Sequence, residues 1–435
     1  MALWLALFIA AALLAAPWRG HVDDIDAQLY LVLARNLARD RAFFDLRFLP
    51  GLLPHFREHL PFGFWPAALA IRALGEWAVG PAYALLTLAS ILIAAEIARG
   101  VAGPWAAVAA ALALGTCESI WQYGGRLLLE PPLLLCATAA AAFALRERPR
   151  WLFASVCAAA AVLIKGPFGL LPLAGVVLGR ALVDRSPRLL LRGSLALLAA
   201  TLPMALFLAL AGTSWRQGYL RDQLFASATG ARSDGVTVFW FPLRVVVGRF
   251  WPGLPLLAFG LWRARREASL QPLAIACAAV LFALCLPHRK WANHAYVAFP
   301  LLASLAGAGA APLIERLRPR ALLAGLSCAA AVAWAASLCG LLRLVLQPPC
   351  PFSTELAEPL ASLAPGAQIL LISPAPEVET LAAAELAAER DLLPTPETGL
   401  PAQSSVRWAL AREGFVQKAP WREIARARGW VLLRQ

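Results

Sequence analysis

Long apolar runs separated by short polar connections make up most of this chain, from Met1 to about Gln347. A helix needs about 20 apolar residues to cross a hydrocarbon core of about 30 Å, with tolerance for shorter runs. The pattern predicts eleven such spans, near 2–17, 80–98, 104–120, 131–146, 150–164, 167–180, 189–211, 241–262, 268–286, 293–311 and 320–346.

Two apolar stretches in the first long connection are expected not to span. The run Pro61–Leu74 is short and contains Pro66 and Arg72, which predicts an interfacial or re-entrant helix. The segment 26–39 carries leucines at helical spacing and predicts an amphipathic helix lying on the membrane.

The composition changes abruptly after Gln347, so we expect a membrane domain at 1–346 and a small α/β domain at 347–435. Apolar runs and helix start and stop signals define its expected elements. These are a strand at Ile369–Ile372, a helix near Pro376, a helix from Ser404 or Ser405 to Gly414, a helix at Pro420–Arg428 and a strand at Trp430–Leu433.

Charge assigns the sides of the membrane. Hydrophobic residues make up 60% of the chain, more than a soluble domain needs, and the net charge of +13 comes from arginine clusters between apolar runs. These clusters form no basic stripe, which argues against nucleic-acid binding. With a cytoplasmic N-terminus, the cytoplasmic connections hold about fourteen arginines against four acids, as the positive-inside rule requires. The loops 18–79, 121–130, 212–240 and 287–292, and the C-terminal domain, then lie outside.

Two of the three lysines, Lys165 and Lys290, stand at junctions of apolar segments. A cation costs about 2.5 kcal/mol or more at the bilayer centre, so such residues predict a functional site with an anionic partner. All five histidines fall on the outer side or at its edge, as do Asp26, Glu58 and Glu130. Carboxylates beside several cations suit group transfer from a lipid phosphate, with one acid taking a proton and the cations holding phosphate oxygens.

Each of these residues also has a structural interpretation when taken alone. Asp26 suits a helix cap, and Glu130 before two prolines suits the charge of a helix N-terminus. Lys165 suits snorkelling to the interface, and His288-Arg289-Lys290 suits a headgroup anchor. Their shared side of the membrane favours the functional interpretation.

Four motifs together resemble a known family. They are Asp26-x-x-x-Tyr30 followed by Ala34-Arg35-Asn36-Leu37, then Glu58-His59-x-Pro61-x-Gly63-Phe64-Trp65, Arg126-x-x-x-Glu130-Pro131, and Lys165-Gly166. Their order and spacing resemble bacterial GT-C glycosyltransferases, which include lipid A aminoarabinose transferases and dolichyl-phosphate-mannose-type protein mannosyltransferases. The resemblance implies an all-α polytopic GT-C membrane domain in the bacterial inner membrane. It also implies inverting transfer of a sugar from a polyprenyl phosphate, such as undecaprenyl phosphate, on the periplasmic face.

The resemblance implies roles for single residues. The essential acid of the family, the expected base, matches Asp26, and the second-loop acid matches Glu130. The lysine that contacts the donor phosphate falls on His59, and the tyrosine after the late lysine falls on Tyr296. Three positions depart from the family pattern. Ala27 replaces the second acid of an Asp-Glu pair, His59 replaces the lysine, and neither Arg221 nor Arg232 clearly matches an expected arginine.

The resulting hypothesis is a glycosyltransferase in which Asp26 and Glu130 are catalytic and Glu58 and Tyr30 support the acceptor. The donor phosphate is expected to bind Lys165, Lys290, Arg126, His59, Arg289 and Tyr296. No metal is required by these residues, and a divalent ion between Asp26 and Glu130 is left open. The expected partners are a polyprenyl-phosphate-linked sugar, the bilayer and a lipid A, protein or polysaccharide acceptor.

Two other functions stay open. A transporter or flippase of a lipid-linked anion would use the same cations as a path, with inverted repeats and helices broken near the midplane. A non-catalytic scaffold of the same fold would explain the changes at Ala27 and His59.

Overall fold

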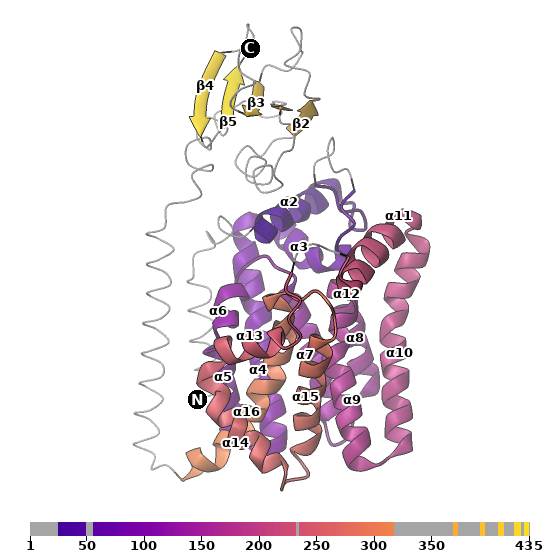
Figure 1. The fold of residues 1–435 in the computed structure, drawn as a ribbon, viewed down its shortest axis with the longest axis vertical. Coiled ribbons are helices and arrows are strands. Elements are labelled where there is room, and N and C mark those ends of the chain that lie inside the picture. Colours follow the sequence, from indigo (N-terminus) through magenta and orange to yellow (C-terminus); the bar gives the residue numbers. More distant parts are fainter. Residues whose placement is uncertain are drawn as a thin grey trace.

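A bundle of helices makes up most of the molecule in the computed structural model, which describes residues 25–48, 55–231 and 235–316 and five strands between 369 and 434 (Figure 1). Within these residues, four helical runs are long and apolar enough to cross a membrane, or five if one bent pair counts as a span. The protein is therefore a multi-pass membrane protein. The four runs are Glu76–Ala102, Trp151–Asp184, Pro187–Leu210 and Ala292–Glu315.

The expected spans near 2–17 and 320–346 lie outside the described residues, so the total of eleven stays a prediction. The described bundle helices are α4 (Val79–Ala102), α5 (Pro104–Gly115), α7 (Glu130–Leu145), α8 (Trp151–Lys165), α9 (Leu171–Asp184), α10 (Pro187–Leu210), α14 (Leu254–Ala264), α15 (Gln271–Cys285) and α16 (Phe299–Glu315).

Shorter elements connect and cover these helices. The α-helical ones are α2 (Ile25–Asp40), α3 (Trp65–Leu74), α6 (Glu118–Tyr123), α11 (Thr213–Trp215), α12 (Ala226–Thr229) and α13 (Phe241–Arg249). The 3₁₀ segments are η2 (Pro61–Phe64), η3 (Glu76–Ala78), η4 (Gly166–Leu170), η6 (Trp251–Gly253) and η7 (Ala292–Ala298), and η5 (Arg216–Phe225) is a π-helix.

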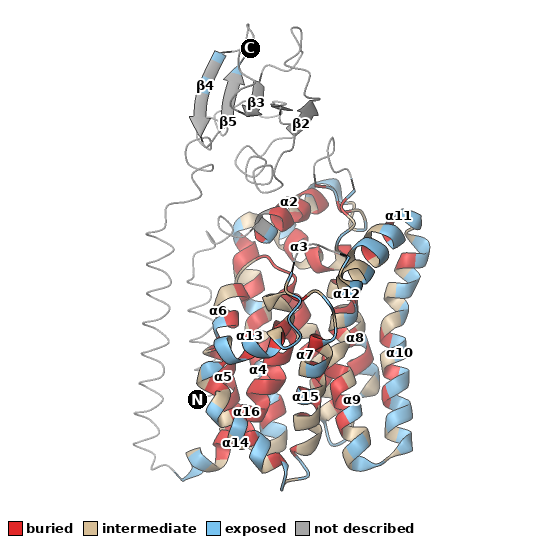
Figure 2. Cartoon of the chain, viewed as in Figure 1, coloured by how far each residue is buried: buried red, intermediate tan, exposed pale blue. Residues whose placement is uncertain are grey.

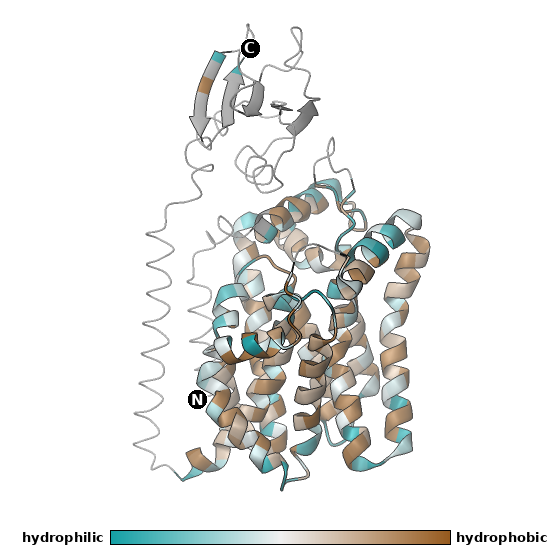
Figure 3. Ribbon diagram, in the orientation of Figure 1, coloured by the Kyte–Doolittle hydropathy of each residue, from teal (hydrophilic) through white to brown (hydrophobic). Residues whose placement is uncertain are grey.

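Small residues let the central helices approach closely. Gly307 of α16 packs directly against Ala106 and Ala110 of α5, and Gly309 packs against Gly260 of α14. Such contacts are typical of helix association in membranes, where no hydrophobic force drives helices together. Figure 2 shows α16 and α4 largely buried, whereas α10 is exposed along its length. The exposed face of α10 is rich in leucine. The brown segments of α10 in Figure 3 mark hydrophobic residues, which fits a lipid-facing surface.

The helical run Trp151–Asp184 consists of two antiparallel helices, α8 and α9, in agreement with the separate spans expected at 150–164 and 167–180. The start of α8 and the end of α9 lie close together, because Arg180 Nη1 near the end of α9 donates a hydrogen bond of 2.7 Å to Arg146 O just before α8. The first half of α10 contacts both helices, through Ser155 with Ala196 O at 3.0 Å and through Gly193 with Val177. The turn between α8 and α9 therefore lies at the opposite end of the bundle from residues 146–150.

The span expected at 241–262 is sharply bent, and whether the bent pair crosses the membrane stays a prediction. Helices α13 and α14 meet at an angle of 80° across Phe250. The cause is local, since Pro252 has no amide hydrogen to donate and Gly253 is a poor helix former. The side chain of Phe250 also fills the space beside Gly253 and is fully buried.

The amphipathic helix expected at 26–39 is present as α2, but its apolar stripe faces protein. Leu29, Leu33 and Leu37 are buried in the main core. Tyr30 packs edge-on to Phe64, with ring centroids 5.1 Å apart. The stripe thus stabilises the packing of α2 on η2 and α3 instead of facing lipid, and the position of α2 at the membrane surface stays a prediction.

The described strands of the C-terminal region form one sheet in the order β2-β1-β3-β5-β4. Strand β1 pairs in parallel with β2 and β3, and β5 pairs antiparallel with β3 and β4. The strands are β1 (Ile369–Ile372), β2 (Leu392–Thr395), β3 (Trp408–Arg412), β4 (Arg422–Ala427) and β5 (Trp430–Arg434).

Strands β1 and β5 agree with the sequence prediction, but the helices expected at 404–414 and 420–428 are wrong, because β3 and β4 occupy these segments. The alanines and arginines of these two segments favour helix in isolation. Strand β5 lies between them and pairs with β3 on one side and β4 on the other, and this pairing outweighs the local preference. The helix expected near Pro376 lies outside the described residues, so an α/β domain stays a prediction.

Candidate active site

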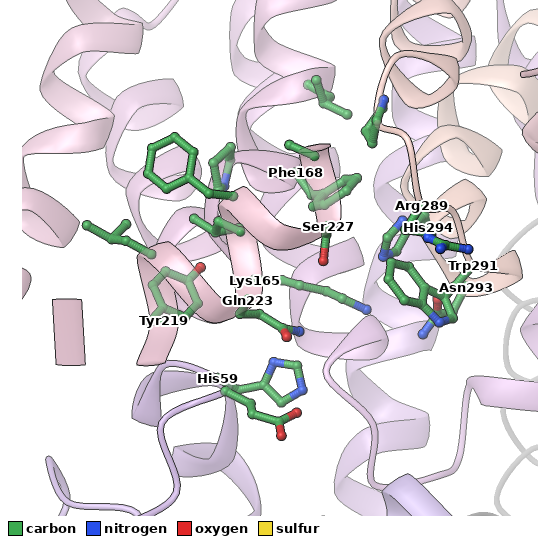
Figure 4. Close-up of a pocket in the computed structure, with 18 of the residues that line it drawn as sticks. His59, Lys165, Phe168, Tyr219, Gln223, Ser227, Arg289, Trp291, Asn293 and His294 are labelled. Carbon is green, nitrogen blue, oxygen red and sulfur yellow. The ribbon is translucent and has the colours of Figure 1, made fainter. Parts of the chain in front are cut away.

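A cavity of about 530 Å³ opens where the first long loop meets the turn between α8 and α9. Its walls come from α2, residues 58–59, η4, η5, α12 and the segment from Ala283 to His294. Figure 4 shows polar and aromatic side chains gathered around Lys165, whose ammonium extends toward Arg289, Trp291 and Asn293. Groups far apart in the sequence thus meet in one hollow.

Six of the ten residues expected in the site line this cavity, and four do not. The six are Asp26, Tyr30, Glu58, His59, Lys165 and Arg289. The four outside the lining are Glu130, Lys290, Arg126 and Tyr296. These six supply two carboxylates, two cations and one imidazole, and His294 adds a second imidazole to the lining.

Asp26 lies in the first turn of α2, one residue after the helix begins, and its side chain is exposed. The positive end of the helix dipole stabilises a carboxylate at this position. Ala27, the next residue, is fully buried, so it could not have held a second carboxylate in the cavity. The acid in the first turn of α2 thus lines the cavity.

His59 is held by Tyr30. The Tyr30 hydroxyl and His59 Nε2 are 2.8 Å apart, and the two rings meet edge-on with centroids 5.5 Å apart. Tyr30 is 5% exposed, so the hydrogen bond forms at the edge of the core and orients the imidazole. The arrangement links α2 to the segment that carries Glu58.

That segment is fixed by Asp45. The carboxylate accepts hydrogen bonds at 2.9 Å from both Arg47 and Arg57, and His55 lies 3.2 Å away. Partial burial acts to raise the pKa of Asp45, but these three partners outweigh it and hold the pKa below its usual value of 3.8. The ionised form of Asp45 therefore stabilises this part of the first loop.

Arg57 also joins the first loop to the third. Its guanidinium lies 4.4 Å from the ring centroid of Trp215, and its aliphatic part packs on Gly218. A cation over an indole face is attractive by about 0.5–2 kcal/mol. Because Trp215 directly precedes the π-helix η5, this contact sets the position of one cavity wall.

Glu130 lies behind Lys165 instead of in the cavity lining. The two side chains form an ion pair in which Glu130 is 2% exposed and Lys165 is 14% exposed. Glu130 begins α7 and Lys165 ends α8, so each charge is also at the favourable end of its helix. The pair leaves the other ammonium hydrogens of Lys165 free to meet a ligand.

The residue after Lys165 must be glycine. Gly166 has φ of +64°, a conformation that side chains disfavour, and the hydroxyl of Tyr219 occupies the place that a Cβ would take. Tyr219 belongs to η5 and is 3% exposed, and burial raises its pKa. The turn that carries Lys165 and the π-helix wall are therefore packed directly together.

Backbone hydrogen bonds fasten the third loop to the fourth. Lys290 exchanges two bonds with Val236, at 2.8 and 2.9 Å, and Arg289 N donates to Ser227 O at 3.0 Å. Lys290 is 3% exposed, so its main contribution to the cavity is the position of Arg289. The Arg289 side chain reaches the cavity and contacts Gly235 O at 3.4 Å.

Two expected site residues lie in a neighbouring buried cluster. Tyr296 is 1% exposed, and its ring meets Tyr123 edge-on at 5.7 Å. The Tyr123 hydroxyl accepts a hydrogen bond of 2.7 Å from Arg249 of α13. Arg126 is half-buried at the end of the same segment, with its backbone N bonded to Tyr123 O. This cluster packs α13 and η7 together beside the site.

Several cavity residues were not identified from the sequence: Phe168, Tyr219, Gln223, Trp291 and Asn293. Trp291 and Asn293 directly follow the Arg289-Lys290 motif, which was a signal for them. Nothing in the sequence marks Gln223, because its position depends on the π-helical register of η5. Within the described residues, no group of three or more His, Cys, Asp or Glu side chains is placed to hold a metal.

A comparison with protein families matches residues 58–212 to the family described as dolichyl-phosphate-mannose-protein mannosyltransferase. No curated protein sequence gives a significant match to the chain.

Solved structures match nearly the whole chain. ArnT from Cupriavidus metallidurans bound to undecaprenyl phosphate aligns with a TM-score of 0.76 and 18% identity, covering 99% of this chain and 97% of ArnT. Its apo structure gives a TM-score of 0.73 at 17% identity with the same coverage. The Archaeoglobus fulgidus oligosaccharyltransferase in its apo form gives 0.57 at 14% identity, covering 94% of this chain and 69% of that one. The chain therefore has the fold of the GT-C glycosyltransferases, as the motifs implied.

Proposed function

We propose that this protein is an integral-membrane glycosyltransferase that moves a sugar from a polyprenyl phosphate to an acceptor of the cell envelope. The observation that carries the proposal is the cavity in which Asp26 and Glu58 meet Lys165 and Arg289. An acid that takes a proton and cations that hold a phosphate are the two parts such a transfer needs.

In the proposed reaction, Asp26 accepts the proton of an acceptor hydroxyl or amine. The acceptor atom forms a bond to the anomeric carbon of the sugar from the side opposite the phosphate. The bond from that carbon to the phosphate oxygen breaks, its electron pair stays on the phosphate, and the configuration inverts. Lys165 and Arg289 stabilise the additional negative charge, which develops as this bond breaks and remains on the released polyprenyl phosphate.

The donor class is supported by the composition of the cavity and by the fold. ArnT, which shares the fold, has been solved with undecaprenyl phosphate bound. Arg289 can bind phosphate oxygens through two N–H groups, and Lys165 acts as a compact charge. His59 stands where the resembling family has a lysine, so it adds a titratable donor to the same group.

The remaining expected residues have supporting roles in this proposal. Glu130 positions Lys165 through their ion pair, and Tyr30 positions His59. Lys290, Arg126 and Tyr296 do not line the cavity, so they act through the backbone and packing contacts described above. We place the cavity on the periplasmic side of the bacterial inner membrane, with a cytoplasmic N-terminus, because that orientation satisfies the positive-inside rule.

The test is transfer by purified protein in lipid nanodiscs, with a radiolabelled undecaprenyl-phosphate sugar and an envelope fraction as acceptor. Asp26→Asn is expected to lower the transfer rate by at least about 100-fold, the usual contribution of a general base. A matched control is Asp184→Asn at the far end of α9, where the carboxylate pairs with Arg180 outside the cavity. Full transfer by Asp26→Asn would reject the assignment.

Two further measurements separate the alternatives. Movement of the labelled lipid across a vesicle membrane without any sugar transfer would indicate a flippase instead. Tight binding of the donor without transfer or movement would indicate a non-catalytic scaffold. Mass spectrometry of envelope glycans from a deletion strain identifies whether lipid A, protein or polysaccharide is the acceptor.

A further inference from the structure

A second group of cations lies at the end of the bundle opposite the cavity, the lower end in Figure 1. The turn from α7 to α8 and the turn from α9 to α10 meet there, because Arg180 donates to the carbonyl oxygen of Arg146. The segments 146–150 and 180–192 hold seven arginines but only two acids, Glu147 and Asp184. Asp184 is already paired with Arg180 at 3.0 Å. The positive charge of these two turns is therefore largely unbalanced.

Four of these arginines have exposed side chains without a partner, and we name them the arginine cluster: Arg148, Arg150, Arg188 and Arg192. Within the described part of the chain, their side chains form no hydrogen bond and no ion pair. A guanidinium has five N–H donors in a planar fork, so each member of the cluster can bind an anion through two of them.

The contact between α8 and α10 brings the cluster together. Arg150 directly precedes α8, and Ser155 of α8 donates to Ala196 O of α10 at 3.0 Å. Arg192 is one turn before Ala196, so it lies on the same side of α10, level with the start of α8. Arg188 is one further turn toward the start of α10. Arginines from two turns that are far apart in the sequence therefore lie next to each other.

These positions are unfavourable for cations unless an anion is bound. Arg150 directly precedes α8, and Arg188 is the second residue of α10. The start of a helix carries partial positive charge, which repels cations and attracts anions. Neither helix has an acid in its first turn. An anion beside both helix starts would relieve the repulsion and accept hydrogen bonds from the guanidinium groups.

Exposed apolar side chains continue from the cluster along both helices. Each is more than half exposed, and they are Leu152, Phe153 and Val156 on α8 and Leu191 and Leu195 on α10. Figure 3 shows the hydrophobic residues of α10 extending along the helix. Basic residues at the end of lipid-facing helices are the arrangement by which membrane proteins bind anionic phospholipids, with the phosphate on the cations and the acyl chains on the apolar face.

The positive-inside rule alone does not account for the cluster. The rule concerns how many cations lie on one side of the membrane, and paired arginines satisfy it as well as unpaired ones. Arginines near two other helix ends are paired within the protein. Arg99 forms two hydrogen bonds of 2.7 Å with Glu96, and Arg263 pairs with Glu267 at 2.6 Å. The arginine cluster differs from both in leaving its donors to a ligand.

We propose that the arginine cluster and the adjoining apolar faces of α8 and α10 bind an anionic phospholipid in the leaflet opposite the cavity. The headgroup phosphate accepts hydrogen bonds from the guanidinium groups, and the acyl chains lie on the exposed leucines. In the orientation proposed above, this is the cytoplasmic leaflet. The site is separate from the cavity, so the inference does not depend on the proposed function.

The test measures the dissociation constants of lipids from delipidated protein in detergent by native mass spectrometry. The probes are cardiolipin, whose two phosphates suit cations on two turns, and neutral phosphatidylcholine. Cardiolipin should bind wild type at least about tenfold more tightly than phosphatidylcholine. Arg150→Gln with Arg192→Gln should weaken cardiolipin binding by about tenfold to thirtyfold and leave phosphatidylcholine binding unchanged. The same two positions changed to lysine should keep most of the affinity, because the charge is retained.

The matched control is Arg265→Gln with Arg266→Gln, which removes two exposed arginines from the turn after α14 and leaves the cluster intact. It should leave the affinity for cardiolipin unchanged. Because all four positions are exposed, each double variant should unfold at the wild-type temperature in lipid-free detergent, which verifies that it is folded. The comparison of the two lipids on wild type needs no variant.

Four results would overturn the proposal. Equal affinities of wild type for the two lipids would show that an anionic headgroup is not preferred. Unchanged cardiolipin binding by the glutamine pair would remove the site from the cluster. An equal loss in the control pair would show a general attraction to positive charge. Displacement of cardiolipin by an equal concentration of inorganic pyrophosphate would identify a soluble anion, and not a lipid, as the ligand.

Discussion

Glu130 and Lys165 form an ion pair in which one charge begins α7 and the other ends α8, with the carboxylate almost completely enclosed. The pair explains how a lysine is tolerated at the junction of two apolar helices. It also gives Glu130 a different position from the one expected, since its carboxylate contacts Lys165 from outside the cavity lining. Asp26, in the first turn of α2, does line the cavity.

Removing Glu130 alone should therefore destabilise the protein strongly. Glu130→Ala leaves a nearly buried ammonium without its partner, for which a loss of about 3–5 kcal/mol in the free energy of unfolding is usual. Replacing both charges, as in Glu130→Ala with Lys165→Met, should cost much less than the sum of the two single changes. Unfolding in detergent measures all four members of this cycle. Additive losses would contradict a coupled pair.

Acidification should weaken the first loop through Asp45. Its pKa is below the ordinary value in the folded state, so the ionised carboxylate stabilises the fold above about pH 4 and the contribution is lost as the pH falls through the folded pKa. The stability difference between wild type and Asp45→Asn should therefore shrink between about pH 5 and pH 2. Thermal unfolding at several pH values measures it. A difference that stays constant over this range would show that Asp45 gains nothing from Arg47 and Arg57.

Gly166→Ala should be damaging although the added group is small. The positive φ costs a residue with a Cβ about 1–2 kcal/mol, and the new methyl meets the Tyr219 hydroxyl. Adding Tyr219→Phe should recover part of the loss but not the backbone cost. Gly100→Ala is a suitable control, because Gly100 lies within α4 with open space around it and should accept alanine without loss. Unfolding midpoints and donor binding report both effects. Equal stability of Gly166→Ala and wild type would refute the close packing of Tyr219.

His59→Lys should strengthen binding of the sugarless polyprenyl phosphate, because lysine places a compact positive charge where the resembling family has one. We expect a gain of up to about tenfold at pH 8, measured as the dissociation constant in nanodiscs. Tyr30→Phe, which removes the 2.8 Å hydrogen bond to His59, tests whether orientation also matters. Identical affinities of wild type and His59→Lys at pH 8 would place His59 away from the phosphate.

The sequence predicted the helices of the bundle because apolar length in a bilayer is a strong and local signal. α4 and α10 fall almost where their runs of apolar residues begin and end. The same signal could not distinguish a straight span from the bent pair α13 and α14, since both are equally apolar. It also could not decide between lipid and protein as the partner of the α2 stripe, because leucines are buried equally well by either. In the C-terminal region, β4 contradicts a local preference for helix, and only its pairing with β5 explains the strand.

For the site, the arginine bias predicted which end of the bundle holds the chemistry, and six expected residues do line one cavity there. Sequence reasoning failed where the answer depends on the direction of a side chain. Glu130 and Lys165 were placed at the same end of the bundle, but nothing in their spacing shows that they face each other. Asn293 was missed for a similar reason, since only the packing of η7 shows that its amide oxygen has no partner.

The wall formed by η5 has a consequence for variation among related chains. In a π-helix each amide bonds to the carbonyl five residues back, so a turn contains one residue more than in an α-helix. If Arg216–Phe225 were wound as an α-helix of the same length, each turn would hold fewer residues and Gln223 would point in another direction. The π-helical form of this short segment, and not only its composition, therefore determines whether Gln223 reaches the cavity.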